Sequence, residues 1–261
     1  MTGTLINAGA ILAGAGAGTL LGGRVPQRVR TTVTDALGIF VLVLGAGDAM
    51  GTFGDELAAV LGSAAVLVIL GALLLGGVIG EAVDLEQRLT TLGAWLRDRV
   101  AGGSEPMAAE PSGPDRDVLE DEHAVHDPRH RFVEGFVVTS LVVCVGPLAI
   151  LGALQDGLTD GFQLLAVKAM LDGFVALAFA SVLGVGVAFA VLPLLALQGS
   201  ITLAAGAIQG LVTPPMLEAL GATGGFLVMG IGLRLLEIRP VRVANLLPSL
   251  VLAPLAVALW P

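Results

Sequence analysis

The sequence is poor in the residues that a water-soluble fold requires. It has no tyrosine and one cysteine, and only 13% of its 261 residues are charged. An ordinary soluble domain has about 25% charged residues, so this chain has too few to cover a surface that faces water. The lone cysteine, Cys144, lies in an apolar run, where it can form no intramolecular disulfide. The scarcity of charge excludes a soluble globular protein.

Apolar residues and glycine are abundant instead. Hydrophobic residues make up 55% of the chain, mean hydropathy is +0.90, and there are 37 glycines. Many glycines are spaced four apart, which lets membrane helices approach closely. These glycines are Gly14/Gly18/Gly22, Gly47/Gly51, Gly76/Gly80, Gly206/Gly210 and Gly221/Gly225. We therefore predict an all-α polytopic membrane protein, a compact bundle whose main partner is the lipid bilayer.

Apolar runs locate the expected membrane spans. A span needs about 20 predominantly apolar residues. The candidates are residues 4–22, 34–50, 57–80, 132–154, 164–189, 193–213, 221–236 and 243–260. We predict about eight transmembrane helices, of which some are broken at prolines.

Charged residues gather between the third and fourth spans. Residues 81–100 place Leu85, Leu89, Leu92 and Leu96 at helical spacing, which predicts an amphipathic helix on the membrane surface. Residues 101–130 are rich in Gly, Pro, Ser and acidic residues and predict a flexible acidic linker. The linker divides a three-span part, residues 1–80, from a five-span part, residues 131–261.

The arginines indicate the orientation, because basic residues favour cytoplasmic loops. If the loop that holds Arg24, Arg28 and Arg30 is cytoplasmic, every basic residue except Lys168 lies on that side. We therefore predict an inner-membrane protein with both termini extracytoplasmic and the loop 81–131 cytoplasmic.

All three histidines lie in the predicted linker. His123, His126 and His130 stand among acidic residues, a mixture that suits zinc. Pro128, however, breaks the helix that a histidine pair four residues apart would require. A solvated linker is the better interpretation, and we expect no metal site and no cofactor.

The sharper signal is the sequence KAMLDG in the fifth span. Lys168, the only lysine, and Asp172 are four residues apart and so lie on one helix face. Counted from the start of the span, Lys168 lies about 6 Å deep and Asp172 about 12 Å deep. An unpaired charge at that depth costs at least about 2.5 to 3.5 kcal/mol, so such residues pair or line a polar path. A structural ion pair and a transport pathway both remain open.

Other polar residues and prolines also lie within the spans. The polar residues are Asn7, Asp48, Ser181, Gln198 and Asn245. Each alone is more typical of a hydrogen bond between helices than of a ligand site. Prolines predict helix breaks within residues 146–152, 192–199 and 245–248. Backbone carbonyls freed at a break are tolerated where they face protein or a wet cavity, as in many carriers.

Several segments together resemble one known family. GTLINAGAILAGAGAG, VVCVGPLAILGALQDGL, LLAVKAMLDGFVALAFASVLGVGVAF, LPLLALQG and RVANLLPSL follow in this order over nearly the whole chain. They resemble the bacterial membrane proteins of domain-of-unknown-function family 554. The resemblance implies a multi-spanning bacterial membrane protein and no established biochemical activity. The positions that match the family's motifs are Asn7, Gly146, Pro147, Asp156, Lys168, Asp172, Gly173, Gln198, Asn245 and Pro248.

The leading functional hypothesis is a transporter or permease for a small polar solute or ion. Its pathway residues would be Lys168, Asp172, Gln198, Asn7, Asn245, Asp156 and Asp48. The alternative is a membrane scaffold or regulator that transports nothing and recruits a partner through the linker. The sequence has no nucleophile elbow, P-loop or dinucleotide fingerprint, so we expect no enzyme. We also expect no nucleic-acid partner, and assembly with further copies of the chain stays open.

The predicted orientation can be tested with single cysteines at Thr159 and Thr90 in a Cys144→Ala background. An impermeant thiol reagent applied to intact cells should label position 159 only, because the basic residues assign position 90 to the cytoplasm. Strong labelling at position 90 alone would show the opposite orientation.

Overall fold

The computed structural model describes residues 1–22, 26–100, 128–144, 146–159, 161–208 and 210–260. Within these ranges the chain forms helices and no strands, as the sequence predicts. Most of the predicted linker, residues 101–130, lies outside the described residues, as do His123 and His126. The division of the chain into three-span and five-span parts therefore stays a prediction.

The first part of the chain forms five α-helices. They are α1 (Thr2–Gly22), α2 (Gln27–Ala49), α3 (Asp55–Leu61), α4 (Ala65–Val83) and α5 (Leu85–Val100), with 3-10 helices η1 (Met50–Phe53) and η2 (Gly62–Ala64) on either side of α3. The predicted span 57–80 is thus divided between α3 and α4. The division falls at Gly62, whose φ of +55° suits glycine and strains other residues.

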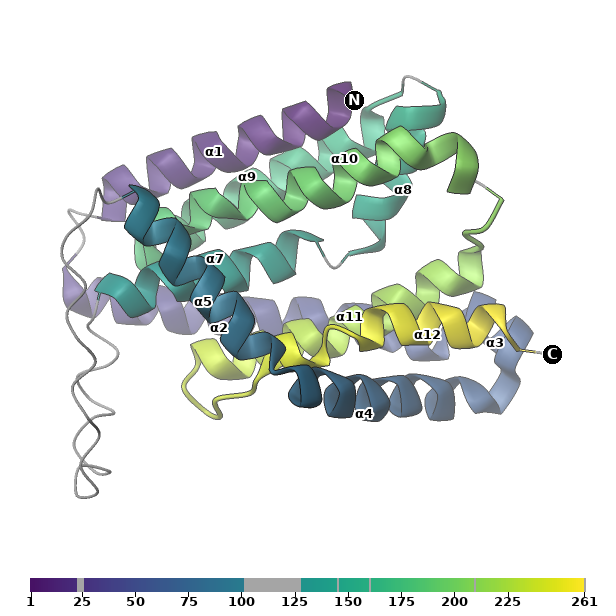
Figure 1. The fold of residues 1–261 in the computed structure, drawn as a ribbon. Coiled ribbons are helices and arrows are strands. Elements are labelled where there is room, and N and C mark those ends of the chain that lie inside the picture. Colours follow the sequence, from purple (N-terminus) through teal and green to yellow (C-terminus); the bar gives the residue numbers. More distant parts are fainter. Residues whose placement is uncertain (23–25, 101–127, 145, 160, 209, 261) are drawn as a thin grey trace.

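The residues that the structure describes after Val100 form six α-helices. They are α7 (Pro128–Cys144), α8 (Pro147–Leu158), α9 (Gln163–Leu183), α10 (Val191–Ile208), α11 (Pro214–Leu235) and α12 (Ser249–Ala258), with 3-10 helices η3 (Val185–Ala190) and η4 (Val243–Leu246). The long helices lie side by side in one bundle, and α12 ends at the same end of the bundle at which α1 begins (Figure 1).

Length and composition mark several helices as membrane spans. Among the described residues, five helices are long and apolar enough to cross a membrane, or six if the bent pair α7–α8 forms one span. One of the five is the continuous stretch Thr31–Val83, which runs from α2 to α4, and a shorter apolar helical segment covers Val243–Ala258. The membrane class is confirmed. The predicted count of eight stays a prediction.

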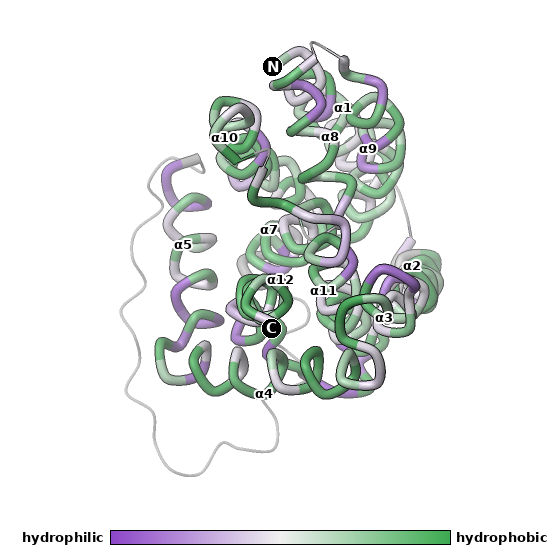
Figure 2. Tube along the Cα trace, turned by 90° about the vertical axis from the view of Figure 1, so that its right-hand side faces the viewer, coloured by the Kyte–Doolittle hydropathy of each residue, from purple (hydrophilic) through white to green (hydrophobic). Residues whose placement is uncertain are grey.

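The outer surface is apolar. Leu20 and Leu203 are each 77% exposed and Phe174 is 74% exposed. Hydrophobic residues predominate along α4, α10 and α12, whereas hydrophilic residues recur along α5 (Figure 2). So large an exposed apolar surface is tolerated in lipid and not in water.

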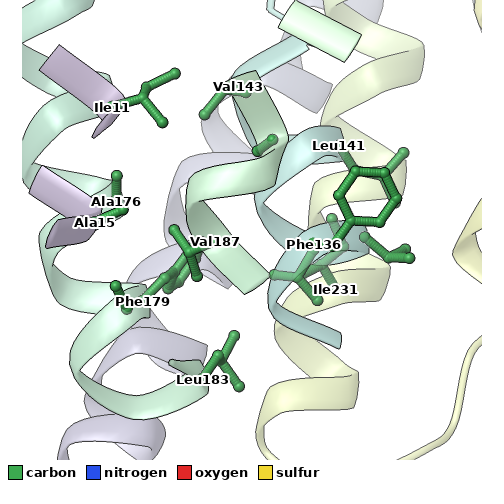
Figure 3. Close-up of a cluster of buried hydrophobic side chains, with 14 of the residues drawn as sticks. Ile11, Ala15, Phe136, Leu141, Val143, Ala176, Phe179, Leu183, Val187 and Ile231 are labelled. Atoms are coloured by element: carbon green, nitrogen blue, oxygen red, sulfur yellow. The ribbon is translucent and has the colours of Figure 1, made fainter. Parts of the chain in front are cut away.

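Two groups of buried apolar side chains hold the bundle together. The larger group joins α1, α7, α9, η3 and α11, with Ile11, Phe136, Phe179 and Ile231 among its members (Figure 3). The smaller group joins α3, α4, α11 and α12 around Leu57 and Ile69. Because α11 contributes side chains to both groups, it connects the larger apolar group to the smaller one.

Within the predicted amphipathic segment, residues 81–100, helix α5 begins at Leu85, whereas residues 81–83 end α4. Leu89 and Leu96 pack against the larger apolar group, and Gly93 lies against Val133 of α7. Leu92, in contrast, is 44% exposed. The leucine periodicity therefore identifies the helix, and one face of it packs against α7.

Of the predicted helix breaks, one is wrong. Pro147 begins α8 after a bend of 64° from α7, and Pro248 directly precedes α12. Pro193, by contrast, lies inside the continuous helix α10. It is the third residue of α10, and backbone N–H groups in a first turn need no partner within the helix, so proline is tolerated there. Our prediction of a break within residues 192–199 is corrected accordingly.

Glycines bring α1 into backbone contact with α9. A Cβ atom at Gly14, Gly18 or Gly22 would overlap a backbone oxygen of α9, those of Gly173, Leu177 and Ser181 respectively. The residue numbers of the glycines on α1 and of their partners on α9 increase together in steps of four, so the two helices are parallel. Lipid gives apolar helices no hydrophobic reason to associate, so this close fit is what holds the pair.

We predict that Gly18→Ala destabilises the protein by about 1–3 kcal/mol, because the new methyl group overlaps the α9 backbone. Gly16→Ala is the matched control: nothing lies within 4 Å of a Cβ atom at Gly16. Thermal unfolding in detergent measures both variants. Equal midpoints for the two would contradict the close α1–α9 contact.

Candidate functional site

Lys168 and Asp172 both face the interior of the bundle from α9. Lys168 Nζ lies 2.6 Å from Asp172 Oδ2 and donates a hydrogen bond to it. The two residues are only 5% and 6% exposed. The pair that the sequence places on one helix face is therefore a buried ion pair, shielded from the surrounding lipid.

Two carboxamides complete the group. Asn7 of α1 donates from Nδ2 to Asp172 Oδ2 at 3.0 Å and to Gln198 Oε1 of α10 at 3.5 Å. Both carboxamide residues are fully buried. Because a carboxylate only accepts, Asn7 must present its nitrogen to Asp172, and Gln198 must then present its oxygen to Asn7. We call Asn7, Lys168, Asp172 and Gln198 the buried polar cluster.

The cluster has unused hydrogen-bonding capacity. Asn7 Oδ1 and Gln198 Nε2 are buried and have no hydrogen-bond partner. The ammonium group of Lys168 can donate three hydrogen bonds, and its contact with Asp172 uses one. A buried polar atom without a partner costs about 1–3 kcal/mol, so these atoms call for a ligand or bound water.

A helix break lies close to the cluster. Cys144, the last residue of α7, is near enough to Lys168 and Asp172 to interact with both charges electrostatically. The bend before α8 follows directly, and a Cβ atom at Gly146 would meet nothing within 4 Å. Figure 1 shows α7 ending partway along the bundle. The helix break after α7 therefore lies within electrostatic range of the charged pair.

Asp156 of α8 serves a different purpose. Its carboxylate accepts hydrogen bonds from the backbone N–H groups of Gly3 and Thr4 at 3.0 and 3.1 Å and from the Thr4 hydroxyl at 3.2 Å. The N-terminal ammonium group lies 3.2 Å from the same carboxylate. Asp156 thus caps the N-terminus of α1, where unpaired N–H groups and the helix dipole favour a negative charge.

Thr202 connects this cap to α10. Its hydroxyl lies 3.3 Å from that of Thr4 and donates to the Ala153 carbonyl of α8 at 3.1 Å. Thr4 and Asn7 are three residues apart on α1, so they lie about one turn apart on the same face. The Asp156 cap and the buried polar cluster are therefore neighbouring polar layers that share helices α1 and α10.

Asn245 belongs to a separate network around Glu86, the second residue of α5. Asn245 Oδ1 accepts from the Glu86 backbone N–H at 2.8 Å, and Asn245 Nδ2 donates to Glu81 at 2.6 Å. Glu86 accepts from Arg234 at 2.6 Å and from the backbone N–H of Ala244 at 2.9 Å. This network ties the α4–α5 junction to α11 and η4.

The structure brings together four of the seven predicted pathway residues, the members of the buried polar cluster. Asp156 lies in the adjoining layer and Asn245 in the Glu86 network. Asp48, near the end of α2, is exposed and has no side-chain partner among the described residues. Sequence reasoning missed Thr4, Thr202 and Glu86. A threonine in an apolar helix carries no signal of its own, and Glu86 is one of many charges in its segment.

No group of histidine, cysteine or acidic residues suited to a metal ion occurs within the part of the chain that the structure describes. The buried polar cluster is instead made of one ion pair, Lys168 and Asp172, and two carboxamides, Asn7 and Gln198. A bundle of apolar helices around such a cluster defines the chain as a polytopic α-helical membrane protein.

The chain belongs to the family described as "Protein of unknown function (DUF554)", whose model matches residues 2–258. It is 31% identical over 259 residues to the uncharacterized protein YqgA of Escherichia coli (strain K12), covering 99% of this chain and 97% of YqgA. It is 25% identical over 257 residues to the uncharacterized membrane protein YdfK of Bacillus subtilis (strain 168), covering 98% and 96%. No solved structure matches. The family resemblance seen in the sequence is thereby confirmed.

We predict that Asp156→Leu lowers stability by about 1–3 kcal/mol, because it leaves the first N–H groups of α1 and the Thr4 hydroxyl without an acceptor. Asp156→Asn keeps one acceptor and should have a smaller effect. Asp48→Leu is the matched control, since that carboxylate is exposed. Thermal unfolding midpoints in detergent test this order of stability, with Asp48→Leu highest and Asp156→Leu lowest. An Asp156→Leu midpoint equal to that of Asp48→Leu would contradict the capping role.

Proposed function

We propose that this protein is a transporter or permease for a small polar solute or ion, and that the buried polar cluster lies on its pathway. The observation that carries this proposal is the pair of unpartnered atoms, Asn7 Oδ1 and Gln198 Nε2, beside a buried ion pair. Polar groups inside a membrane protein are costly and typically mark substrate or ion paths.

The helix break supports the same proposal. Carriers commonly build their sites where a broken helix meets polar side chains near the middle of the membrane. Here the end of α7 lies within electrostatic range of Lys168 and Asp172. A scaffold that transports nothing requires neither a buried charge pair nor unpaired amide atoms. It is therefore the less favoured alternative.

The proposed location is the bacterial inner membrane, with both ends of the chain extracytoplasmic. The distribution of arginine supports this orientation, since all basic residues except Lys168 fall in loops assigned to the cytoplasm. The start of α1 and the end of α12 lie at one end of the bundle (Figure 1), which is consistent with it.

The test compares deletion strains that express the wild type, Asp172→Asn, the double variant Lys168→Met/Asp172→Leu, or no protein. Solutes and ions in cells and medium are measured by untargeted mass spectrometry and elemental analysis. We expect the wild type to redistribute at least one solute or ion, and both variants to be folded and inactive, because the pathway has lost its carboxylate.

Ser181→Ala is the matched control on α9, since the one bond of the Ser181 hydroxyl among the described residues is to the Ala178 carbonyl of its own helix at 2.7 Å. It should behave as the wild type. Two results would contradict the proposal: a folded wild type that redistributes nothing, or a double variant with full wild-type activity. The second would mean that the pair is only structural, because replacing both members of a buried ion pair with apolar residues is often neutral for stability.

A further inference from the structure

We infer that the buried polar cluster binds an uncharged solute that carries both a hydrogen-bond donor and an acceptor, such as a hydroxyl or carboxamide compound. This inference rests on the proposed transport function and specifies its substrate class. It follows from the pairing of the charges in the cluster and from the identity of the two atoms left free, Asn7 Oδ1 and Gln198 Nε2.

The two charges in the cluster already neutralise each other. Lys168 Nζ is 2.6 Å from Asp172 Oδ2, and neither group has another ionised side chain as a salt-bridge partner among the described residues. A solute ion would enter a buried site of zero net charge and would find its own charge unpaired. Burial of an unpaired charge is strongly unfavourable, so this arrangement selects against ions.

The free amide atoms are of opposite kinds. Asn7 Oδ1 can only accept a hydrogen bond, and Gln198 Nε2 can only donate one. A cation would be attracted by the first atom and repelled by the second, whereas the reverse holds for an anion. A hydroxyl group or a carboxamide satisfies both atoms, because it donates and accepts.

The two free atoms are close enough for one small molecule to reach both. A carboxamide separates its oxygen from its nitrogen by about 2.2 Å, so two amides in contact at 3.5 Å have their other polar atoms at most about 8 Å apart. Next to Gln198 in the chain, a Cβ atom added at Gly199 would meet only the flexible end of Met1, at 3.7 Å.

The test uses purified protein in liposomes and a fixed set of probes. Glycerol, urea and acetamide are the uncharged probes, and sodium, chloride and acetate are the ions. Stopped-flow light scattering follows the uncharged probes, and ion-sensitive dyes follow the ions. We expect at least one uncharged probe to cross faster than in protein-free liposomes, with no ion flux above that background.

Gln198→Leu removes the free donor and leaves the bond between Asn7 and Asp172 in place. We expect it to lower the protein-dependent flux about tenfold, the effect of one lost hydrogen bond to a bound solute. Ser200→Ala is the matched control on α10: Ser200 is exposed, and its hydroxyl bonds only to the Leu197 carbonyl of its own helix. It should leave the flux unchanged.

The remaining outcomes separate this inference from the proposed function. Ion flux that depends on Gln198 would overturn the substrate class and keep the transporter. Water flux alone that depends on Gln198 would show that the free atoms bind only water, and would overturn the inference. A folded wild type that moves no probe at all would overturn the inference and count against transport itself, which the metabolite comparison in cells tests independently.

Discussion

The close contact between α1 and α9 is the constraint on which the polar interior depends. Gly14, Gly18 and Gly22 let the backbones of two parallel helices touch, at a separation that no larger residue would allow. Only at that separation can a side chain as short as Asn7 reach Asp172 on the neighbouring helix. The glycine packing between α1 and α9 therefore sets the distances between the polar side chains of the site.

In several places, a carboxylate from a distant helix accepts hydrogen bonds from N–H groups at a helix start that have no partner within their own helix. Asp156 of α8 serves α1, Glu218 of α11 accepts from the Leu57 N–H of α3 at 2.6 Å, and Glu86 of α5 accepts from the Ala244 N–H of η4. No side-chain cap of their own is present on α3 and η4. In an apolar surrounding an unpaired N–H group is expensive, and acids placed this way satisfy it while fixing which helices meet.

The sequence alone predicts the helical class, the location of most long apolar helices and the placement of Lys168 and Asp172 on one helix face, because each of these follows from local composition and period. It names Asn7 and Gln198 as pathway candidates, but it cannot predict that these two, 191 residues apart, meet beside Asp172 while the candidates Asp48, Asp156 and Asn245 lie elsewhere. Periodicity describes one helix at a time and carries no information on which helices touch. The same limit explains the wrong prediction at Pro193. A proline can mark a helix break or occupy the first turn of a helix, and the sequence does not distinguish these cases. The structure does, because α10 starts at Val191.

The cap on α1 also bears on how the protein is made. Synthesis produces α1 long before α8 and α9, so its first N–H groups, its glycine face and the amide of Asn7 all enter the membrane ahead of the residues that satisfy them. Until α8 and α9 have been synthesised, the first helix lacks the carboxylates that accept its hydrogen bonds in the folded protein. The partners that fix its position in the bundle are therefore complete only after Asp156 and Asp172 have been synthesised, so α1 pairs with α8 and α9 across more than half of the chain.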